Sequence, residues 1–410
     1  MLHTSDWHIG HTLHGFPRNE DFDAVLAEIV AIAQEYRPDL IVHSGDLFHT
    51  SRPTGRDMIR ALQVLIRLAT VAPTVVVAGN HDSPTYFEFF DLLTGPSVGR
   101  GLFFVDQVRP AHEGGVLTFD ACGGEQRIRL AALPFVHPNR FWQRSAPDTS
   151  YSDYAEGMRE LQAQLLEAMR EGYDPDRDIL FFAAHVYITG AKRSPREQAM
   201  DVSFEAAPED LPKVSYTALG HIHCPQAVRG PKFPARYSGS PLAMDFGEAN
   251  DSKSVVIVDA EPGRPVRVQP RPLSSGRRLA VFEGTLDKLR AEAAQYDGTF
   301  LKLLITGEEP DGTLSQKIAE IVPDAIVIRP ELAGEAATDA ILGCDPGDEP
   351  DLPDAFRAFL VQVGLSGAAA ESMVTAFIQL LSEVDDETPP PVRAEELLRA
   401  ALEDTWAEAS

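Results

Sequence analysis

The stretch DLIVHSGDLFH (39–49) carries the main signal for the fold. Its first half is a short run of apolar and β-branched residues, which is typical of a strand buried inside an α/β protein. Its second half places an acid, Asp46, and a histidine, His49, at or just past the end of that strand. Open α/β sheets bind ligands outside the carboxyl ends of their strands. The stretch therefore predicts both a layered α/β fold and one edge of a functional site.

Four more segments repeat this arrangement of a strand followed by polar side chains. They are DWH (6–8), GNHD (79–82), AAHVYITGA (183–191) and GHIHCPQ (220–226). Within D-x-H and H-x-H, the spacing of two sends both side chains to the same side of an extended segment. Each segment alone is a weak signal, because GNHD is also an ordinary turn and a lone histidine is more often a packed core residue. GDLFH (45–49) and these four segments hold six of the chain's twelve histidines, and together they predict one shared metal site.

The predicted ligands are carboxylate, amide and imidazole groups, which suit borderline-hard divalent ions such as Mn²⁺, Fe²⁺ or Zn²⁺. Their number suffices for two ions. Two ions about 3.5–4 Å apart need a bridging carboxylate, and they clamp the attacking and leaving oxygens of a displacement at phosphorus. Asp46 is the natural bridge because it ends the central strand. The predicted metal ligands are Asp6, His8, Asp46, Asn80, His185, His221 and His223.

The first two-thirds of the chain alternates strand-like runs with amphipathic helical stretches. This alternation indicates an α/β protein, with a layered mixed β-sheet flanked by helices over residues 1–265. Helices are predicted at 21–36 and 55–69. Strands are predicted at 39–45, 73–79, 127–133, 179–185, 216–221 and 254–259.

A second, smaller domain is expected after a segment at 262–276 that is dense in Pro and Gly and typical of a linker. Residues 277–335 predict a small α+β capping domain in which three strands alternate with two helices. The second of these helices is expected to begin with a capping box formed by Thr313 and Gln316.

A helical tail is expected over residues 350–410, behind an acidic connector. Its apolar stripes, which include Met373 and Phe377, fit equally well with packing inside the chain and with binding of a partner. The predicted tail helices lie at 354–363, 367–384 and 393–406.

Composition narrows the functional classes. The net charge is −26, and fifteen acids against three arginines in residues 345–410 supply −12 of it. Proteins that bind nucleic acid normally carry a basic surface, so a nuclease of this composition would need positive potential from divalent ions, local loops or a partner. Three cysteines in separate contexts fit a reducing, cytoplasmic location. No apolar run approaches the roughly 18–20 residues that span a bilayer, and no signal-peptide pattern is present, so neither a membrane nor secretion is expected.

The order D-x-H, G-D-x-x-H, G-N-H-D, a lone strand-end histidine and G-H-x-H resembles the calcineurin-like metallophosphoesterases. Within them the chain is similar to the SbcD-type DNA nucleases, the bacterial counterparts of the eukaryotic Mre nuclease of double-strand break repair. The likeness includes LHTSDWHIGHTLHG (2–15) and YSGSPLAMDFGE (237–248). It also includes the layout of catalytic domain, capping domain and helical tail.

The resemblance implies a role for each site residue. The ligands would form two sets that share one carboxylate. One set is Asp6, His8, Asp46 and His223, and the other is Asp46, Asn80, His185 and His221. His81 would touch the scissile phosphate or protonate the leaving oxygen, and His49 would assist exonuclease action. The usual ion would be Mn²⁺.

The resemblance also implies substrates and partners. The activity would be exonuclease action on duplex ends and endonuclease action on single strands or hairpins, in DNA repair, recombination and replication. Since the chain has no G-x-x-x-x-G-K-[ST] segment, ATP hydrolysis would come from a separate SbcC-type coiled-coil ATPase bound through the C-terminal helices. A homodimer within a heterotetramer is implied likewise. Arg52, Lys192 and Arg193 are candidate contacts to DNA phosphates. For each of them, a solvent-exposed charged residue in a loop, without a role in DNA binding, is the simpler interpretation.

A phosphatase or cyclic-nucleotide phosphodiesterase on the same fold is the alternative function. Protein phosphatases of this superfamily carry GDxxDRG, whereas this chain has GDLFHTSR (45–52), with His49 in place of the second aspartate. Small-molecule phosphodiesterases are generally shorter and lack a cap and a helical tail. A non-enzymatic scaffold is disfavoured, because every metal position carries a competent ligand.

Overall fold

The computed structural model describes most of the first 332 residues and ten positions between 353 and 378. The described ranges are 1–95, 99, 101–109, 115–136, 151–194, 197, 205–231, 233–307 and 313–332. Met1–Leu13 and Pro17–Leu332 belong to one compact unit. The positions between 353 and 378 belong to a second unit. Among the described residues, no helix combines the length and the hydrophobicity that a membrane span requires.

Two mixed six-stranded sheets form the centre of the first unit. In order across the sheet, the first consists of β16 (Arg267–Pro272), β15 (Ser254–Asp259), β1 (Leu2–Thr4), β4 (Ile41–His43), β5 (Thr74–Val77) and β6 (Leu102–Val105). The second consists of β13 (Gln226–Ala227), β14 (Ala235–Tyr237), β12 (Tyr216–Gly220), β9 (Asp178–His185), β8 (Gln126–Leu133) and β7 (Val116–Ala121). Strands β1, β4, β5 and β6 run parallel to one another, and so do β8, β9, β12 and β14.

The two sheets lie face to face, because one apolar cluster contains side chains from both. Val42 and Val75 of the first sheet share this cluster with Phe181, Ala183 and Tyr216 of the second. Residues on the opposite faces of the strands are also buried, under helices. Strands covered on both faces have near-continuous apolar sequences, which is the pattern that predicted them.

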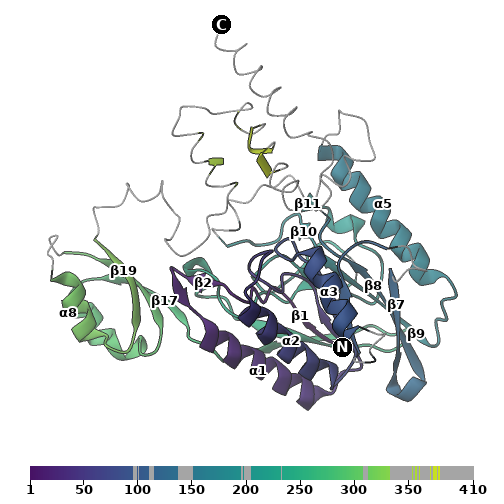
Figure 1. Ribbon diagram of the computed structural model, residues 1–410, viewed down its shortest axis with the longest axis horizontal. Coiled ribbons are helices and arrows are strands. Elements are labelled where there is room, and N and C mark those ends of the chain that lie inside the picture. The colour runs from purple at the N-terminus through teal and green to yellow at the C-terminus, as the bar shows by residue number, and fades with distance from the viewer. Residues whose placement is uncertain are drawn as a thin grey trace, which may run out of the picture. The chain divides into compact units, whose positions relative to one another are not determined.

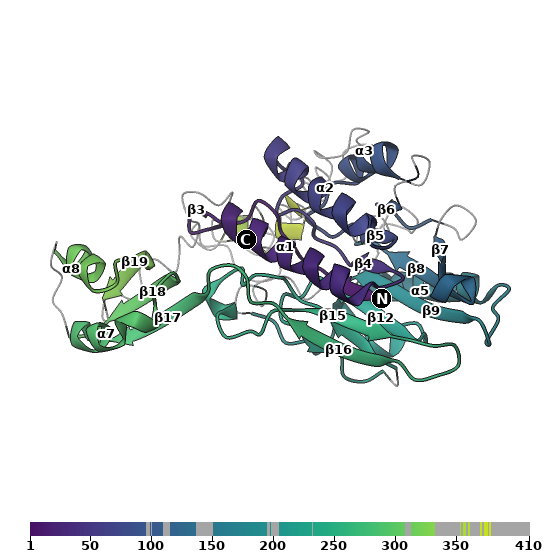
Figure 2. The ribbon, with the colours of Figure 1, turned by 90° about the horizontal axis from the view of Figure 1, so that it is seen from below.

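Helices cover the outer face of each sheet. α1 (Asn19–Tyr36), α2 (Gly55–Ala69) and α3 (Pro84–Thr94) pack their apolar sides onto the first sheet. Figure 2 shows α1 and α2 running side by side on that face. α5 (Tyr151–Arg170) covers the second sheet (Figure 1). The predicted α/β class is confirmed, and α1 and α2 match the predicted helices to within two residues.

A three-stranded parallel sheet with two helices follows the two main sheets. Its elements are β17 (Leu279–Gly284), α7 (Leu286–Glu292), β18 (Phe300–Ile305), α8 (Leu314–Ile321) and β19 (Ile326–Leu332). It has an apolar cluster of its own, which includes Leu289, Leu303 and Ile318. The predicted capping box is wrong: Thr313 lies at the N-cap of α8, but its backbone is helical and its side chain makes no cap hydrogen bond. An N-cap hydroxyl normally needs an extended backbone.

Charged and aromatic side chains join this small sheet to the main body. The ring of Phe300 on β18 lies 5.6 Å from the guanidinium of Arg18 and 4.7 Å from that of Arg277. Asp21 accepts from both arginines, at 3.5 and 2.9 Å. Arg18 is buried and also donates to the carbonyl of Ala243. The buried charge of Arg18 is therefore paired with a carboxylate, which buried ions require.

The remaining elements are short. Two-residue strands are β2 (Thr12–Leu13), β3 (Phe16–Pro17), β10 (Tyr187–Ile188) and β11 (Glu205–Ala206). Single 3₁₀ turns lie at Cys122–Gly124, Pro208–Asp210, Phe246–Glu248 and Ala293–Gln295. In the second unit, Leu360, Met373 and Val374 are buried against one another, and the rings of Phe356 and Phe377 lie 4.4 Å apart. The helix predicted at 393–406 lies outside the described residues.

Candidate metal centre

Loops at the carboxyl ends of five strands build the site. Parallel neighbours end at the same edge of a sheet, so β1, β4 and β5 deliver their following residues together, and β9 and β12 do the same in the second sheet. These loops bring together all seven residues predicted as metal ligands. One carboxylate–imidazole pair joins the two sheets, because His185 Nε2 lies 3.4 Å from Asp46 Oδ2.

One group of candidate ligands contains Asp6, His8 and His223. Their ligand atoms lie within 4.8 Å of one another. The Nε2 atoms of His8 and His223 are 3.0 Å apart. Asp6 is fully buried, and its Oδ1 accepts the backbone N–H of His221 at 2.9 Å.

The other group contains Asp46, His185 and His221, with Asn80 between the two rings. Asn80 Oδ1 lies 3.0 Å from His185 Nε2 and 3.0 Å from His221 Nδ1. The ligand atoms of Asp46, His185 and His221 again lie within 4.8 Å of one another. An amide oxygen, two imidazole nitrogens and a carboxylate therefore point at one place.

Asp46 reaches both groups with the same oxygen. Its Oδ2 lies 3.5 Å from His8 Nε2 and 3.4 Å from His185 Nε2. Its Oδ1 accepts the backbone N–H of His81 at 3.0 Å, which fixes the carboxylate. A carboxylate shared in this way has the position of a bridge between two cations.

The chemistry of these groups fits divalent ions. Asp6 Oδ2 is buried and accepts no hydrogen bond from the described part of the protein. Burial, opposed by nearby histidines, raises the pKa of Asp6 to about 7. Burial alone would lower the pKa of His185, but the charge of Asp46 and its hydrogen bond raise this pKa to about 9. Metal ligands bind in their deprotonated form, so a metal ion would compete with protons at these two groups.

The backbone around the candidate ligands adopts unusual conformations that let their side chains lie close together. Asp6, His8 and Asp46 have φ of 52°, 47° and 54°, which is a left-handed conformation that costs non-glycine residues about 1–3 kcal/mol. Gly79 has no side chain where the carboxylate of Asp46 passes: a Cβ there would lie 2.1 Å from Asp46 Oδ1. Strands β1 and β4 end before these residues, and the chain turns sharply at Asp6 and Asp46. This turn directs the candidate ligands into the site.

His81 and His49 lie beside the two groups. The rings stack with centroids 5.7 Å apart and an interplanar angle of 13°. His81 Nδ1 lies 2.7 Å from the carbonyl of His49, so Nδ1 carries the proton and the Nε2 of His81 is left for another partner. His8, His49 and His81 also have ligand atoms within 4.8 Å of one another. Both residues therefore adjoin the predicted ions.

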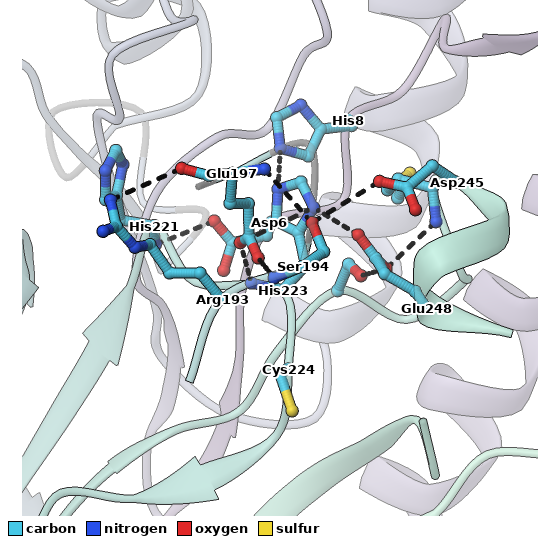
Figure 3. A network of polar contacts seen from close by, with 12 residues as sticks. Asp6, His8, Arg193, Ser194, Glu197, His221, His223, Cys224, Asp245 and Glu248 are labelled. Carbon is cyan, nitrogen blue, oxygen red and sulfur yellow. Dashed lines mark hydrogen bonds and ion pairs between the residues drawn. The ribbon is translucent and has the colours of Figure 1, made fainter. Parts of the chain in front are cut away.

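The basic residues predicted to contact DNA have different settings. Arg193 stacks over the ring of Tyr187 at 4.6 Å and lies 3.5 Å from the carbonyl of Glu197. Lys192 is largely exposed and pairs with Asp251 at 3.3 Å. Arg52 is exposed in the loop before α2. Arg193 is thus brought next to the loop of His223, as Figure 3 shows.

The acids that support the ligands were not predicted from the sequence. Asp82, the last residue of GNHD, accepts backbone N–H groups from Gly79, Leu47 and Phe48, and so ties the second and third motif loops together. Glu248 ends the segment YSGSPLAMDFGE and lies 2.9 Å from His223 Nδ1 (Figure 3). Both acids stand in segments quoted above, but no sequence signal shows which groups they contact.

Comparisons with known proteins agree with this architecture. A family model described as calcineurin-like phosphoesterase matches residues 1–225. A relative from Bacillus subtilis (strain 168), named as the SbcD component of the SbcCD nuclease, is 29% identical over 402 residues, which cover 94% of this chain and 99% of that protein. The protein of the same name from Escherichia coli (strain K12) is 28% identical over 313 residues, 72% of this chain and 74% of that protein. The resemblance expected from the motifs is confirmed.

Gly79→Ala is expected to weaken binding of Mn²⁺ by about 10-fold or more, because the added Cβ would collide with Asp46 Oδ1 and displace the shared ligand. Equilibrium dialysis of the metal-free chain measures this. Gly55→Ala is the matched control, since no atom of the described residues lies within 4 Å of its Cβ position. Wild-type affinity in Gly79→Ala would show that Asp46 does not hold the ions.

Proposed function

Since the chain belongs to the calcineurin-like phosphoesterase family, we propose that it is a metal-dependent DNA nuclease that uses two divalent ions, most simply Mn²⁺. The observation that carries the proposal is the position of Asp46, whose Oδ2 lies 3.5 Å from His8 Nε2 and 3.4 Å from His185 Nε2. Relatives that cover most of the chain are named as nuclease components, which favours DNA over smaller phosphodiesters. The substrates would be duplex ends for exonuclease action, and single strands or hairpins for endonuclease action.

The ligands would divide into two sets that share Asp46. One set is Asp6, His8, Asp46 and His223, and the other is Asp46, Asn80, His185 and His221. Bound divalent ions supply Lewis acidity at phosphorus and lower the pKa of water toward neutrality. The ions would also offset the acidity of the chain next to a DNA phosphate, so that no broad basic surface is needed.

His81 would act on the leaving oxygen. Because Nδ1 of His81 faces a carbonyl at 2.7 Å, the ring presents Nε2 to the substrate. A proton at Nε2 would stabilise or protonate the leaving 3′ oxygen. His49 stacks on His81 and would position both the ring and a duplex end, which is a role for exonuclease action.

The alternative is a phosphatase or cyclic-nucleotide phosphodiesterase with the same metal centre. The nuclease is favoured because His49 stands in the position where phosphatases carry the second aspartate of GDxxDRG, and because the chain has additional elements after β16. Arg193 and Lys192 lie near the loop of His223 and are proposed contacts for DNA phosphates, with Arg52 on the loop that follows His49.

Assembly with other chains is part of the proposal. A homodimer through the catalytic domain is supported by exposed apolar side chains on α3, where Phe89, Leu92 and Leu93 are 51%, 72% and 50% exposed. An SbcC-type coiled-coil ATPase would bind through residues 350–410, which co-purification with and without that segment would test.

Two free cysteines among the described residues, Cys122 and Cys224, fit the proposed cytoplasmic location.

The purified chain with Mn²⁺ is expected to degrade linear duplex DNA and to nick circular single-stranded DNA. Asp46→Ala should abolish both activities, because both ions lose their shared ligand. Product analysis on gels measures these activities, with bis-p-nitrophenyl phosphate and a cyclic nucleotide as comparison substrates. Hydrolysis of the small esters with intact DNA would favour the alternative function.

His81→Ser is expected to retain both ions and to lose about 10²–10⁴-fold in turnover, the usual contribution of a general acid. His49→Ser should reduce exonuclease action on duplex ends more than endonuclease action on circles. Metal analysis beside the two assays separates these effects. If the ions are lost together with activity, then His81 is a ligand, and equal losses in His49→Ser would remove its proposed role.

Leu92→Asp should shift the protein from dimer to monomer in sedimentation velocity, because a charge would be buried at the centre of the proposed dimer contact. Val281→Asp is the matched control, since Val281 is an exposed apolar residue on β17. Melting temperatures establish that both variants are folded. A dimer that persists in Leu92→Asp, or a monomeric wild type, contradicts the proposed contact.

A further inference from the structure

The imidazole of His223 is supported differently from the other rings of the centre. His223 Nδ1 lies 2.9 Å from a carboxylate oxygen, Glu248 Oε1. His185 Nδ1 faces a neutral group instead, the carbonyl of Ser44 at 3.0 Å. His8 Nδ1 is buried and makes no hydrogen bond to the residues that the structure describes. Among these three rings, which all direct Nε2 at the candidate ions, His223 is the one backed by a negative charge.

Glu248 is held rigidly in place. It is 1% exposed, and its second oxygen, Oε2, accepts from Lys253 Nζ at 2.6 Å and from the backbone N–H of Met244 at 3.1 Å. Lys253 is also buried, and its Nζ donates to Ser240 Oγ and to the carbonyl of His223, both at 3.0 Å. Burying an ion pair is costly, and such a pair is kept stable by hydrogen bonds to its remaining atoms.

Three polar groups of His223 have partners that are not candidate metal ligands. Its backbone N–H donates to Glu197 Oε1 at 2.8 Å, its ring Nδ1 faces Glu248, and its carbonyl accepts from Lys253. The remaining atom is Nε2, which lies 3.0 Å from His8 Nε2. Figure 3 shows Glu197 and Glu248 on different segments converging on this one residue.

We propose that Glu248 is a positioning residue that sets the affinity of one ion of the pair, the ion held by Asp6, His8 and His223. The carboxylate fixes the proton of His223 on Nδ1, leaves the Nε2 lone pair for the metal, and makes that nitrogen a stronger donor. Lys253 aims the carboxylate at the ring. The inference rests on the two-ion centre of the proposed function, and it predicts that the two ions are supported unequally.

Calorimetric titration of the metal-free full chain with MnCl₂, without DNA, tests this. The wild type should bind two ions. Glu248→Gln should weaken one of them by about 10–100-fold, the usual effect of losing such a partner, and change the other by no more than about twofold. Asp178→Asn is the control, because Asp178 is also a buried acid in an ion pair, with Arg127 at 2.6 Å, but it lies outside the centre. It should leave both affinities unchanged.

A second variant separates a local effect from misfolding. Glu248→Gln leaves Lys253 buried without its carboxylate, so Glu248→Gln combined with Lys253→Met removes both charges and should show the same selective loss. Equal weakening of both ions, no weakening, or unfolding of both variants would overturn the inference. A wild type that binds two ions but leaves DNA intact would refute the proposed nuclease function, while the affinities would still decide the role of Glu248.

Discussion

The carboxylate of Asp46 can serve two ligand groups only if the ends of two separate sheets meet across it. Its Oδ2 lies 3.5 Å from His8 Nε2 of the first-sheet side and 3.4 Å from His185 Nε2 of the second. A relative shift of the sheets by one ångström would break one of these approaches. The apolar cluster between the sheets therefore sets the geometry of the centre, although it includes none of the candidate ligands.

A series of buried hydrogen bonds, in addition to the apolar packing, fixes how the two sheets are aligned. Ser44, directly before the turn to Asp46, has its hydroxyl 2.8 Å from His3 Nε2, and His3 Nδ1 lies 3.0 Å from the hydroxyl of Tyr216. The carbonyl of Ser44 faces His185 Nδ1. Apolar surfaces alone slide easily, whereas buried hydrogen bonds are satisfied in one alignment. These hydrogen bonds thus link both sheets and one candidate metal ligand through buried residues.

The sequence predicted much of this structure because the signals were local. The helices α1 and α2 follow from apolar periodicity, and the seven candidate ligands follow from polar residues at strand ends. The exact strand bounds and the number of sheets could not be predicted from the sequence. Strand β4 covers Ile41–His43 where 39–45 was expected, because the chain leaves the sheet early to enter the left-handed turn at Asp46. The division into two sheets depends on long-range pairing, which periodicity does not encode.

The support of His223 was missed for a similar reason. Glu248 and Lys253 lie 25 and 30 residues beyond it. The chain has 62 acidic residues, and the sequence does not show which of them contacts His223. The expected capping box at Thr313 failed because the motif specifies side chains but not the extended backbone that a cap needs. Residue types at strand ends thus predict the candidate ligands, while their supporting partners require the fold.

The central claim is that Asp46 bridges two ions, and anomalous diffraction from crystals soaked in MnCl₂ tests it most directly. Two anomalous peaks are expected about 3.5–4 Å apart, one among Asp6, His8 and His223 and one among Asn80, His185 and His221, with Asp46 between them. A single peak, or two peaks of which one lies away from Asp46, would contradict the account.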